Sequence, residues 1–448
     1  MSLATAPACR ATEETTLDRP DRSSWRLTIV ALTVWAVLLV VARWWGLVVA
    51  SDATGDLHLG AIPLFGKWRL LVTGRLAVAV VIGVAGVVVL PAITVRGRWR
   101  LVLAATAIGA VAWGGALAVA DAPTAWNSIH DDYGQHINRV DSAGLGGFLR
   151  DYTADQPTFP THLQAHPPGL VVLLWASDRT GISGRGYEVA LALAGAALAT
   201  VAALVVLADV AGEQLARRAV PFVVLLPAAV WHTNADTFFA GVAGAAVAFV
   251  IVASGRSGSR RTWLAVAGGA VFGAALLFTY GVALLALPVA VVLHRRRAIR
   301  VGLVAVAATV LVLAIPALWG FWWPAGLAAT KQQYDLNLAL VRPAGYFRFA
   351  NLAVFALALG PAIAVALARL RDRAAWVVVG SGLAVVLLAD ASGLSSGETE
   401  RIWQPFIPLV AVAGCALAGS ARRYASRPWL GLQVITAIGL QVALRSPW

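Results

Sequence analysis

The chain has 448 residues, of which 59% are hydrophobic and only 13% are charged, and its mean hydropathy is +0.77. Soluble globular proteins carry about 25% charged residues, so this composition excludes an ordinary soluble enzyme and predicts a chain embedded in a lipid bilayer. The net charge of +13 does not indicate nucleic-acid binding, because the arginines occur in short turns between apolar runs.

A polar segment precedes a long series of apolar runs. Residues 1–26 contain charges of both signs and predict a disordered cytoplasmic tail. A spanning helix needs roughly 20 apolar residues, and the runs that reach or approach this length predict an all-α polytopic membrane protein with about 13 transmembrane helices. The run 262–294 is too long for one span, so we divide it near Tyr280-Gly281. The expected spans are 27–50, 70–93, 101–120, 187–209, 217–232, 236–254, 262–279, 281–294, 300–319, 348–368, 374–390, 404–420 and 428–443.

Arginine-rich turns alternate with acidic ones along this map. Cytoplasmic loops are enriched in Lys and Arg, so the arginine turns predict the cytoplasmic side of a multi-pass plasma-membrane protein. Most acidic residues then fall on the outer side, either because they serve a function there or because the outer loops are longer and polar. The arginine turns contain Arg96, Arg98 and Arg100; Arg217 and Arg218; Arg256, Arg260 and Arg261; Arg295–Arg297 and Arg300; Arg369, Arg371 and Arg373; and Arg422, Arg423 and Arg427.

Three outer loops separate the spans and contain most of the polar residues. The first is expected to include a helix near 130–142. The apolar segment 168–177 that follows it is too short to span, which predicts a re-entrant or interfacial helix. The expected organisation is the tail 1–26, an N-terminal transmembrane hairpin 27–100, a membrane module 101–420 with outer loops 121–167, 320–347 and 391–404, and a C-terminal transmembrane helix 421–448.

The first outer loop contains the sequence Asp131-Asp132-Tyr133, with His136 close behind. Adjacent carboxylates on a helix point about 100° apart, so one can face a cleft while the other binds a neighbouring group. A carboxylate held at a membrane interface can have a raised pKa and act as a general base on an alcohol. The alternative is a solvated helix start, where Asp is favoured in the first turn.

His162 and His166 follow in the same loop, and Pro167-Pro168 comes directly after them. Proline fits the first turn of a helix, where its missing N–H has no partner. The two histidines have the spacing of a metal pair only if one continuous helix carries both, and the prolines argue against that helix. Contact with a polar substrate is therefore expected in preference to metal binding.

Glu400 and Arg401 stand at the outer start of a later span, where an arginine breaks the inside pattern of the others. A guanidinium suits a phosphate or carboxylate bidentately, and the alternative is an internal ion pair with Glu398 or Asp390. Lys331, in the second outer loop, could meet an anionic head group. Asp236 is expected to cap the helix that follows it.

Together these motifs resemble the GT-C superfamily of integral-membrane glycosyltransferases. The family has an acidic pair with a Tyr in its first large outer loop, here Asp131-Asp132-Tyr133, and a His/Lys-Pro-Pro motif, here His166-Pro167-Pro168-Gly169. A later element at an outer helix start, here Glu400-Arg401 through Pro405, is also similar. The resemblance covers roughly residues 101–420, and the length and span pattern suggest the actinobacterial methylthioxylose transferase type.

The resemblance implies transfer of a sugar from a polyprenyl-phosphate donor to a cell-envelope glycan or glycolipid, such as lipoarabinomannan, on the extracytoplasmic face. Asp131 would be the general base and Asp132 would assist. No metal site or certain cofactor follows, although a divalent cation such as Mg or Mn is compatible with the carboxylates. In the substrate-binding set, Arg401 and Lys331 would hold the lipid phosphate; its members are Tyr133, His136, His162, His166, Lys331, Glu400, Arg401 and Asp56.

The sequence departs from the family pattern at its start, because two extra spans and a loop with Asp56 come before the acidic pair. Either Asp131 or Asp56 could therefore be the base. A competing hypothesis is a transporter or flippase for a lipid-linked envelope precursor, which would place charged residues near the bilayer midplane. A non-catalytic partner in polysaccharide assembly would need only the loops and the spans.

Overall fold

The computed structural model describes residues 22–52, 57–122, 124–418 and 426–447. Within these ranges the chain is helical apart from two small antiparallel strand pairs, which confirms the all-α prediction. The predicted disordered tail lies mostly outside the described residues, and the first helix already begins at Arg22, inside the predicted tail. The strands are β1 (Gly60–Ala61), β2 (Leu64–Phe65), β3 (Lys67–Trp68) and β4 (Leu444–Arg445).

Eight helices in the described part are long and apolar enough to cross a membrane, or nine if one sharply bent pair counts as a single span. The bent pair is α16 (Ala344–Leu359) and α17 (Pro361–Arg369), which meet at 94°. The eight are α1 (Arg22–Asp52), α2 (Leu76–Arg96), α3 (Trp99–Ala120), α8 (Arg185–Ala211), α10 (Ala235–Ser254), α11 (Gly258–Phe278), α13 (Ile299–Ala317) and α18 (Arg373–Ala391).

The predicted number of 13 spans is not confirmed, because four of the apolar runs form short or broken helices. Proline accounts for part of this, since it cannot continue a helix without losing a backbone hydrogen bond. The split near Tyr280-Gly281 is confirmed. The four runs form α9 (Glu213–Val224) with η4 (Pro227–Trp231), η5 (Gly281–Leu285) with α12 (Ala286–Arg295), α20 (Ile407–Ala411) with η6 (Val412–Leu417), and α21 (Arg427–Ala443).

The three predicted outer loops contain most of the remaining short helices. The predicted helix near 130–142 is divided into shorter pieces, whereas the short apolar helix expected at 168–177 is confirmed as α7. These elements are η1 (Thr124–Trp126), α4 (Ser128–Asp132), η2 (Gly134–His136), α5 (Asn138–Asp155), η3 (Gln156–Thr158), α6 (Thr161–Gln164), α7 (Gly169–Asp178), α14 (Trp323–Leu336), α15 (Leu338–Val341) and α19 (Thr399–Ile402).

Each end of the bundle has its own set of polar contacts. At one end, Arg296 Nη1 donates to Asp209 Oδ2 at 2.6 Å and to Ser254 Oγ at 2.9 Å, so the α12–α13 turn meets the C-terminal ends of α8 and α10. At the other end, His130 Nδ1 on α4 lies 3.3 Å from Glu188 Oε1 in the first turn of α8. The 27 residues of α8 span roughly 40 Å at 1.5 Å per residue, which is enough to cross a bilayer between these ends.

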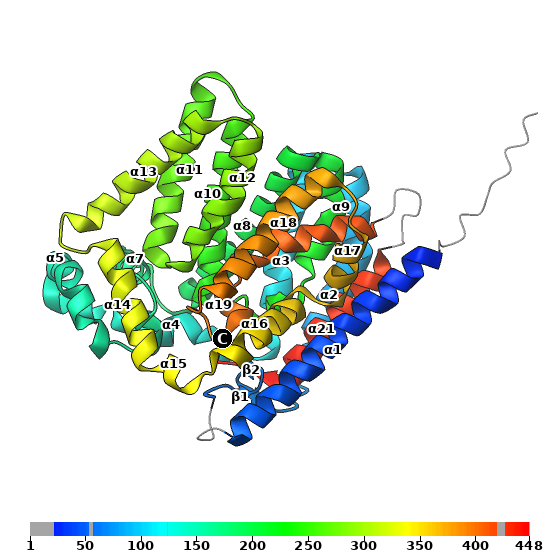
Figure 1. The fold of residues 1–448 in the computed structure, drawn as a ribbon, viewed down its shortest axis with the longest axis horizontal. Coiled ribbons are helices and arrows are strands. Elements are labelled where there is room, and N and C mark those ends of the chain that lie inside the picture. The colour runs from blue at the N-terminus through cyan, green and yellow to red at the C-terminus, as the bar shows by residue number, and fades with distance from the viewer. Residues whose placement is uncertain (1–21, 53–56, 123, 419–425, 448) are drawn as a thin grey trace, which may run out of the picture.

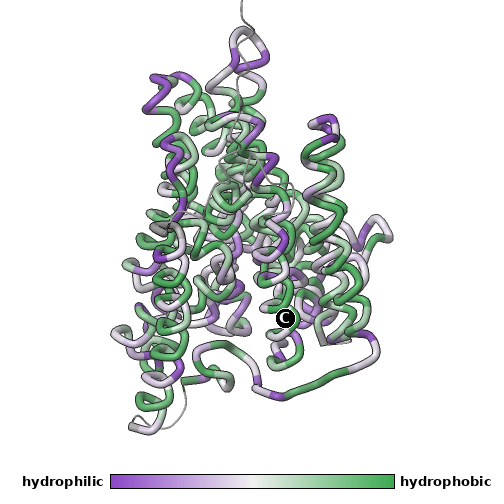
Figure 2. Tube along the Cα trace, turned by 90° about the vertical axis from the view of Figure 1, so that its right-hand side faces the viewer, coloured by the Kyte–Doolittle hydropathy of each residue, from purple (hydrophilic) through white to green (hydrophobic). Residues whose placement is uncertain are grey.

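The figures show the same division. In Figure 1, α4, α5, α14, α15 and α19 gather at one end of the molecule, while the turn between α10 and α11 lies at the opposite end. In Figure 2 the long helices are mostly green, and purple is commonest near helix ends and in connecting segments. Large apolar side chains point outward from the long helices, among them Val34 on α1, Val81 on α2 and Leu311 on α13, which are 58%, 64% and 70% exposed. Such surfaces suit contact with lipid.

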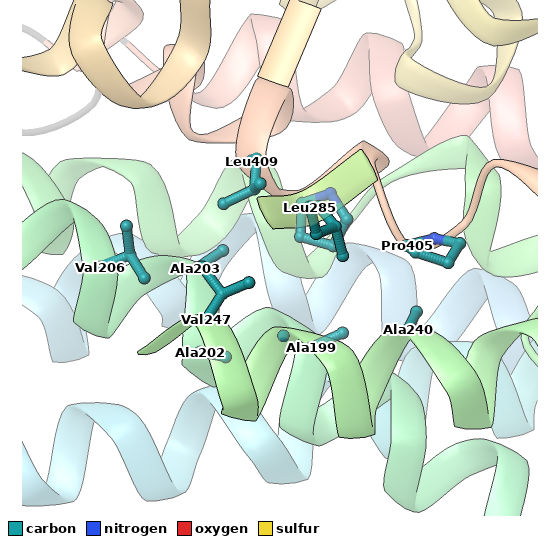
Figure 3. A pocket seen from close by; sticks show the side chains of 11 residues that line it. Ala199, Ala202, Ala203, Val206, Ala240, Val247, Leu285, Pro405 and Leu409 are labelled. Carbon is teal, nitrogen blue, oxygen red and sulfur yellow. The ribbon is translucent and has the colours of Figure 1, made fainter. Parts of the chain in front are cut away.

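The centre of the bundle is closed by small residues. A Cβ atom added to Gly241 on α10 would lie 2.5 Å from the carbonyl oxygen of Gly195 on α8, so the two backbones touch. Close helix contact through glycine is typical of membrane bundles. The cavity nearby holds only about 10 Å³, no more than a single water needs. Figure 3 shows its apolar lining, including Leu285, Pro405 and Leu409, so it offers no ligand site.

A thiol-labelling pair tests the two ends. We expect Ser142→Cys on α5 and Ser257→Cys before α11 to react with an impermeant maleimide from opposite sides of the membrane, because both positions are exposed at opposite ends of the bundle. Labelling is compared in intact cells and inverted vesicles, after Cys9 and Cys415 have been replaced by serine. Reaction of both cysteines from the same side would contradict this arrangement.

Candidate functional site

A buried arginine organises the polar end of the bundle. Arg401 on α19 is only 7% exposed. Its Nη1 donates to Asp236 Oδ2 at 2.8 Å, and its Nη2 donates to Glu398 Oε2 at 2.7 Å and lies 3.1 Å from His162 Nδ1. The structure thus contains the ion pair with Glu398 that was the alternative to phosphate binding, whereas Asp390 accepts a hydrogen bond from Asn351 at 3.0 Å. We call Arg401, Asp236, Glu398, His162 and Asp132 the Arg401 cluster.

Asp236 enters the Arg401 cluster from the first turn of α10. The prediction that Asp236 caps this helix is wrong, because the cap is Asn234, whose side chain accepts from the backbone N–H of Thr237 at 3.1 Å. Asn is among the preferred N-cap residues. With Asn234 as the cap, the Asp236 carboxylate, whose side chain is 4% exposed, is available to Arg401.

Glu398 lies between two guanidinium groups. Arg342 Nη2 donates to Glu398 Oε1 at 2.9 Å and to the carbonyl of His58 at 3.0 Å. The other two nitrogens of Arg342 donate to the carbonyls of Leu57 and Ser396. Burial alone would raise the pKa of Glu398, but the positive charges of Arg401 and Arg342 outweigh it and lower that pKa to about 2. Two arginines thus face the carboxyl groups of Asp236 and Glu398, and this pairing compensates the buried charge.

His162 is held on the short helix α6 by the elements around it. Tyr152 on α5 donates from its hydroxyl to the carbonyls of Leu163 at 3.2 Å and His166 at 2.9 Å. Thr330 on α14 donates to the carbonyl of Gln164 at 2.9 Å. The backbone around His162 is therefore tied to two other helices, which orients its imidazole toward Arg401.

The hydrogen-bond partners of His162 decide which of its ring nitrogens carries the proton. Arginine can only donate, so His162 Nδ1 accepts from Arg401 and Nε2 holds the hydrogen. That Nε2 lies 3.5 Å from Asp132 Oδ1. Burial, together with the charge of Arg401, lowers the pKa of His162 to about 3, so the ring is neutral at physiological pH.

Solvent can reach His162, whose side chain is 22% exposed, and also Asp132, whose side chain is 20% exposed. Burial raises the pKa of Asp132 to about 7, although the charge of Arg401 opposes this rise. A carboxyl group with such a pKa is partly ionised at neutral pH and can take up a proton there. The neighbouring Asp131 is exposed to solvent, and its side chain has no ion pair among the described residues.

Two other predicted residues pack beside the Arg401 cluster. Tyr133 is 2% exposed, and its ring meets that of His166 edge-on at 5.9 Å. His166 is also buried, and its Nδ1 lies 3.3 Å from the carbonyl oxygen of Phe278. Pro168 forms the N-cap of α7, in agreement with the expected helix start. Both buried rings lie close to Asp236 and Arg401.

The remaining predicted residues lie elsewhere. Glu400 is fully buried and accepts from the backbone N–H of Phe65 at 3.0 Å, and burial raises its pKa to about 7. Lys331 is exposed on α14 and forms an ion pair with Asp335. His136 is partly buried near Arg139, and burial lowers its pKa. Asp56 lies outside the described residues.

Sequence reasoning missed Arg342 and the pairing of Asp236 with Arg401. Asp236 is 165 positions from Arg401, and Arg342 is 56 positions from Glu398, so no local pattern joins them. One indication was available for Arg342, which stands in an outer loop against the inside placement of most arginines. Within the described residues, no group of three or more His, Cys, Asp or Glu side chains has an arrangement that could hold a metal ion.

Comparison of the chain with protein-family models, curated proteins and solved structures finds no match.

The role of Arg401 as an organiser predicts a large stability loss on its removal. We expect Arg401→Gln to lower the free energy of unfolding by about 3–5 kcal/mol, because it leaves Asp236 buried without its cationic partner and leaves Glu398 with Arg342 alone. The measurement is SDS-induced unfolding of the purified protein. As a control, Arg179→Gln breaks an ion pair whose side chains are 60% and 48% exposed, and it should cost less than about 1 kcal/mol. Equal losses in both variants would contradict the organising role.

Proposed function

We propose that this protein is an integral-membrane glycosyltransferase that moves a sugar from a polyprenyl-phosphate donor to a glycan or glycolipid acceptor on the extracytoplasmic face. One observation carries the proposal: Asp132, a half-buried carboxyl group with a pKa of about 7, stands against a neutral histidine and a compensated arginine at the polar end of an apolar helix bundle. The partial burial of Asp132, the charges around it and its access to solvent suit a general base.

The proposed reaction is a substitution at the anomeric carbon of the donor sugar. An acceptor hydroxyl gives its proton to Asp132, and its oxygen forms a bond with the anomeric carbon. The bond between that carbon and the phosphate oxygen breaks, and polyprenyl phosphate leaves with the bonding electrons. General-base assistance of this kind contributes typically 10²–10⁴-fold to a rate.

Asp132 is a better candidate base than Asp131, the residue that the family resemblance favours. Asp131 is exposed to solvent on α4, and its side chain has no ion pair among the described residues that would orient it. Asp132 instead faces the Nε2 hydrogen of His162, and this contact orients its carboxylate. His162 and Arg401 are then positioning residues, which act through Asp132.

The donor phosphate needs a cation that is free to exchange partners. Both terminal nitrogens of Arg401 are already engaged by carboxylates, so we assign Arg401 to organising the cluster in preference to holding the phosphate. Lys331 is 48% exposed and paired only with the equally exposed Asp335. Surface pairs of this kind are weak, so Lys331 can exchange Asp335 for a phosphate group.

The position of the charged groups favours this function over transport. Asp236 lies in the first turn of α10, and the other members of the Arg401 cluster belong to short helices and loops outside the long spans. Transporters commonly place ionisable residues near the bilayer midplane. A cluster at the end of the bundle suits chemistry at the membrane surface.

Substitution of the two adjacent aspartates separates their roles. We expect Asp132→Asn to reduce sugar transfer by about 10²–10⁴-fold, as removal of a general base does, while Asp131→Asn retains most activity. Transfer is measured with radiolabelled polyprenyl-phosphate sugar and an envelope-glycan acceptor, after both variants have been shown to melt near the wild-type temperature. Full activity of Asp132→Asn would overturn the base assignment, and absence of transfer by the wild type with any such donor would overturn the function.

The pKa of Asp132 sets the expected pH dependence. The base must be ionised to accept a proton, so transfer should rise with pH through a midpoint near 7 and fall below it. The measurement is the initial rate at saturating donor and acceptor between acidic and mildly alkaline pH. Asp131→Asn serves as the control and should keep a rising profile, with its midpoint slightly lower because the charge of Asp131 contributes to the raised pKa of Asp132. A flat profile of the wild type across neutrality would contradict the assignment.

A further inference from the structure

A second cavity lies beside α4, next to His130 and Glu188. Its volume is about 160 Å³, and it is enclosed by α4 and η2, the end of α7 and the start of α8. The residues that line it include His130, Gly134, Leu174, Asp178, Tyr187 and Glu188. We call it the His130–Glu188 cavity.

An acceptor atom in this cavity lacks a partner. Glu188 is 4% exposed, and its Oε1 lies 3.3 Å from His130 Nδ1. Its Oε2 is buried and has no hydrogen-bond partner among the described residues. A buried carboxylate oxygen without a donor is costly, so this atom points to a ligand that supplies an O–H or N–H group.

The sequence keeps this space open with a glycine. A Cβ atom on Gly134 would lie 2.2 Å from Glu188 Oε1 and 2.9 Å from His130 Nδ1. Any larger side chain would therefore displace the pair that faces the cavity. Ser177 and Tyr187 are joined by a hydrogen bond of 2.8 Å between their hydroxyls, which fixes the Tyr187 ring at the same wall.

The size and lining of the cavity narrow the class of ligand. A cavity of roughly 150 Å³ holds one six-membered ring such as benzene, and the His130–Glu188 cavity has a similar volume. Its polar side chains, among them His130, Tyr187 and Glu188, favour a ring that carries hydroxyl groups. Because Asp178 and Glu188 both line it, a phosphate would be repelled there and a neutral ring is favoured.

We propose that the His130–Glu188 cavity is a subsite for one neutral pyranose ring of the acceptor, with a ring hydroxyl donating to Glu188 Oε2. The proposal rests on the glycosyltransferase function and adds where its acceptor binds. His130 and Asp132 stand two residues apart on α4, so the same short helix contacts the bound ring and carries the base.

The test is direct binding of methyl α-D-glucopyranoside to the purified full-length protein, measured by saturation-transfer NMR. The detergent is a zwitterionic one without a sugar head group. We expect saturable binding to the wild type and at least tenfold weaker binding to Glu188→Gln, which loses a hydrogen bond to a charged group. Gly134→Ala should weaken binding similarly, because its Cβ displaces the pair of Glu188 and His130. Both variants are first shown to melt near the wild-type temperature.

Three controls make the result decisive. Glu213→Gln is the same substitution at an exposed position on α9, and it should leave binding unchanged. Cyclohexanol, a ring of similar size with one hydroxyl, should bind at least tenfold more weakly than the glucoside. Absence of saturable binding to the wild type, equal binding by Glu188→Gln, or equal binding of cyclohexanol would each overturn the subsite.

Asp132→Asn separates this proposal from the proposed function. We expect this variant to bind the glucoside as the wild type does and to lose transfer. Retained transfer by Asp132→Asn together with lost binding by Glu188→Gln would overturn the base assignment and leave the subsite standing. Loss of transfer by Asp132→Asn together with unchanged binding by Glu188→Gln would overturn the subsite and leave the base assignment standing.

Discussion

The structure depends on the burial of one guanidinium group. Arg401 draws together a helix start, a short loop helix and the segment before α19, because each supplies an acceptor that its charge requires. Removing a charge from water costs several kcal/mol, and only a full set of acceptors offsets this cost. Arg342 extends the network to the segment that follows α1. Segments far apart in the chain are therefore held in one arrangement by electrostatics, within a bundle that is otherwise apolar.

Two side chains of the short helix α4 contact different parts of the structure. Its Asp132 side chain faces His162, while its His130 side chain faces Glu188 at the start of α8. The tight backbone contact between Gly195 and Gly241 fixes α8 against α10, and hence fixes the helix starts that carry Glu188 and Asp236. Packing of small residues inside the membrane thus determines distances between polar groups at its surface.

Much of the fold follows from runs of apolar residues. The spans around α8, α10 and α11, the break at Tyr280-Gly281 and the short helix α7 were all predicted, because each depends on local length and hydropathy. The predicted number of spans is not confirmed. A run such as 217–232 is apolar enough, but its chain turns into η4 at Pro227 and does not continue as one helix.

The sequence by itself determined that this is a helical membrane protein, which polar segments gather between its spans, and that Arg401 needs an anionic partner such as Glu398. These properties depend on composition and on neighbours a few residues away. Only the tertiary structure decided that Asp236 completes the pairing of Arg401, and that Asp132 faces the cluster while Asp131 faces solvent. Both outcomes require the direction of a side chain and the approach of a distant helix, which residue types and spacing do not contain.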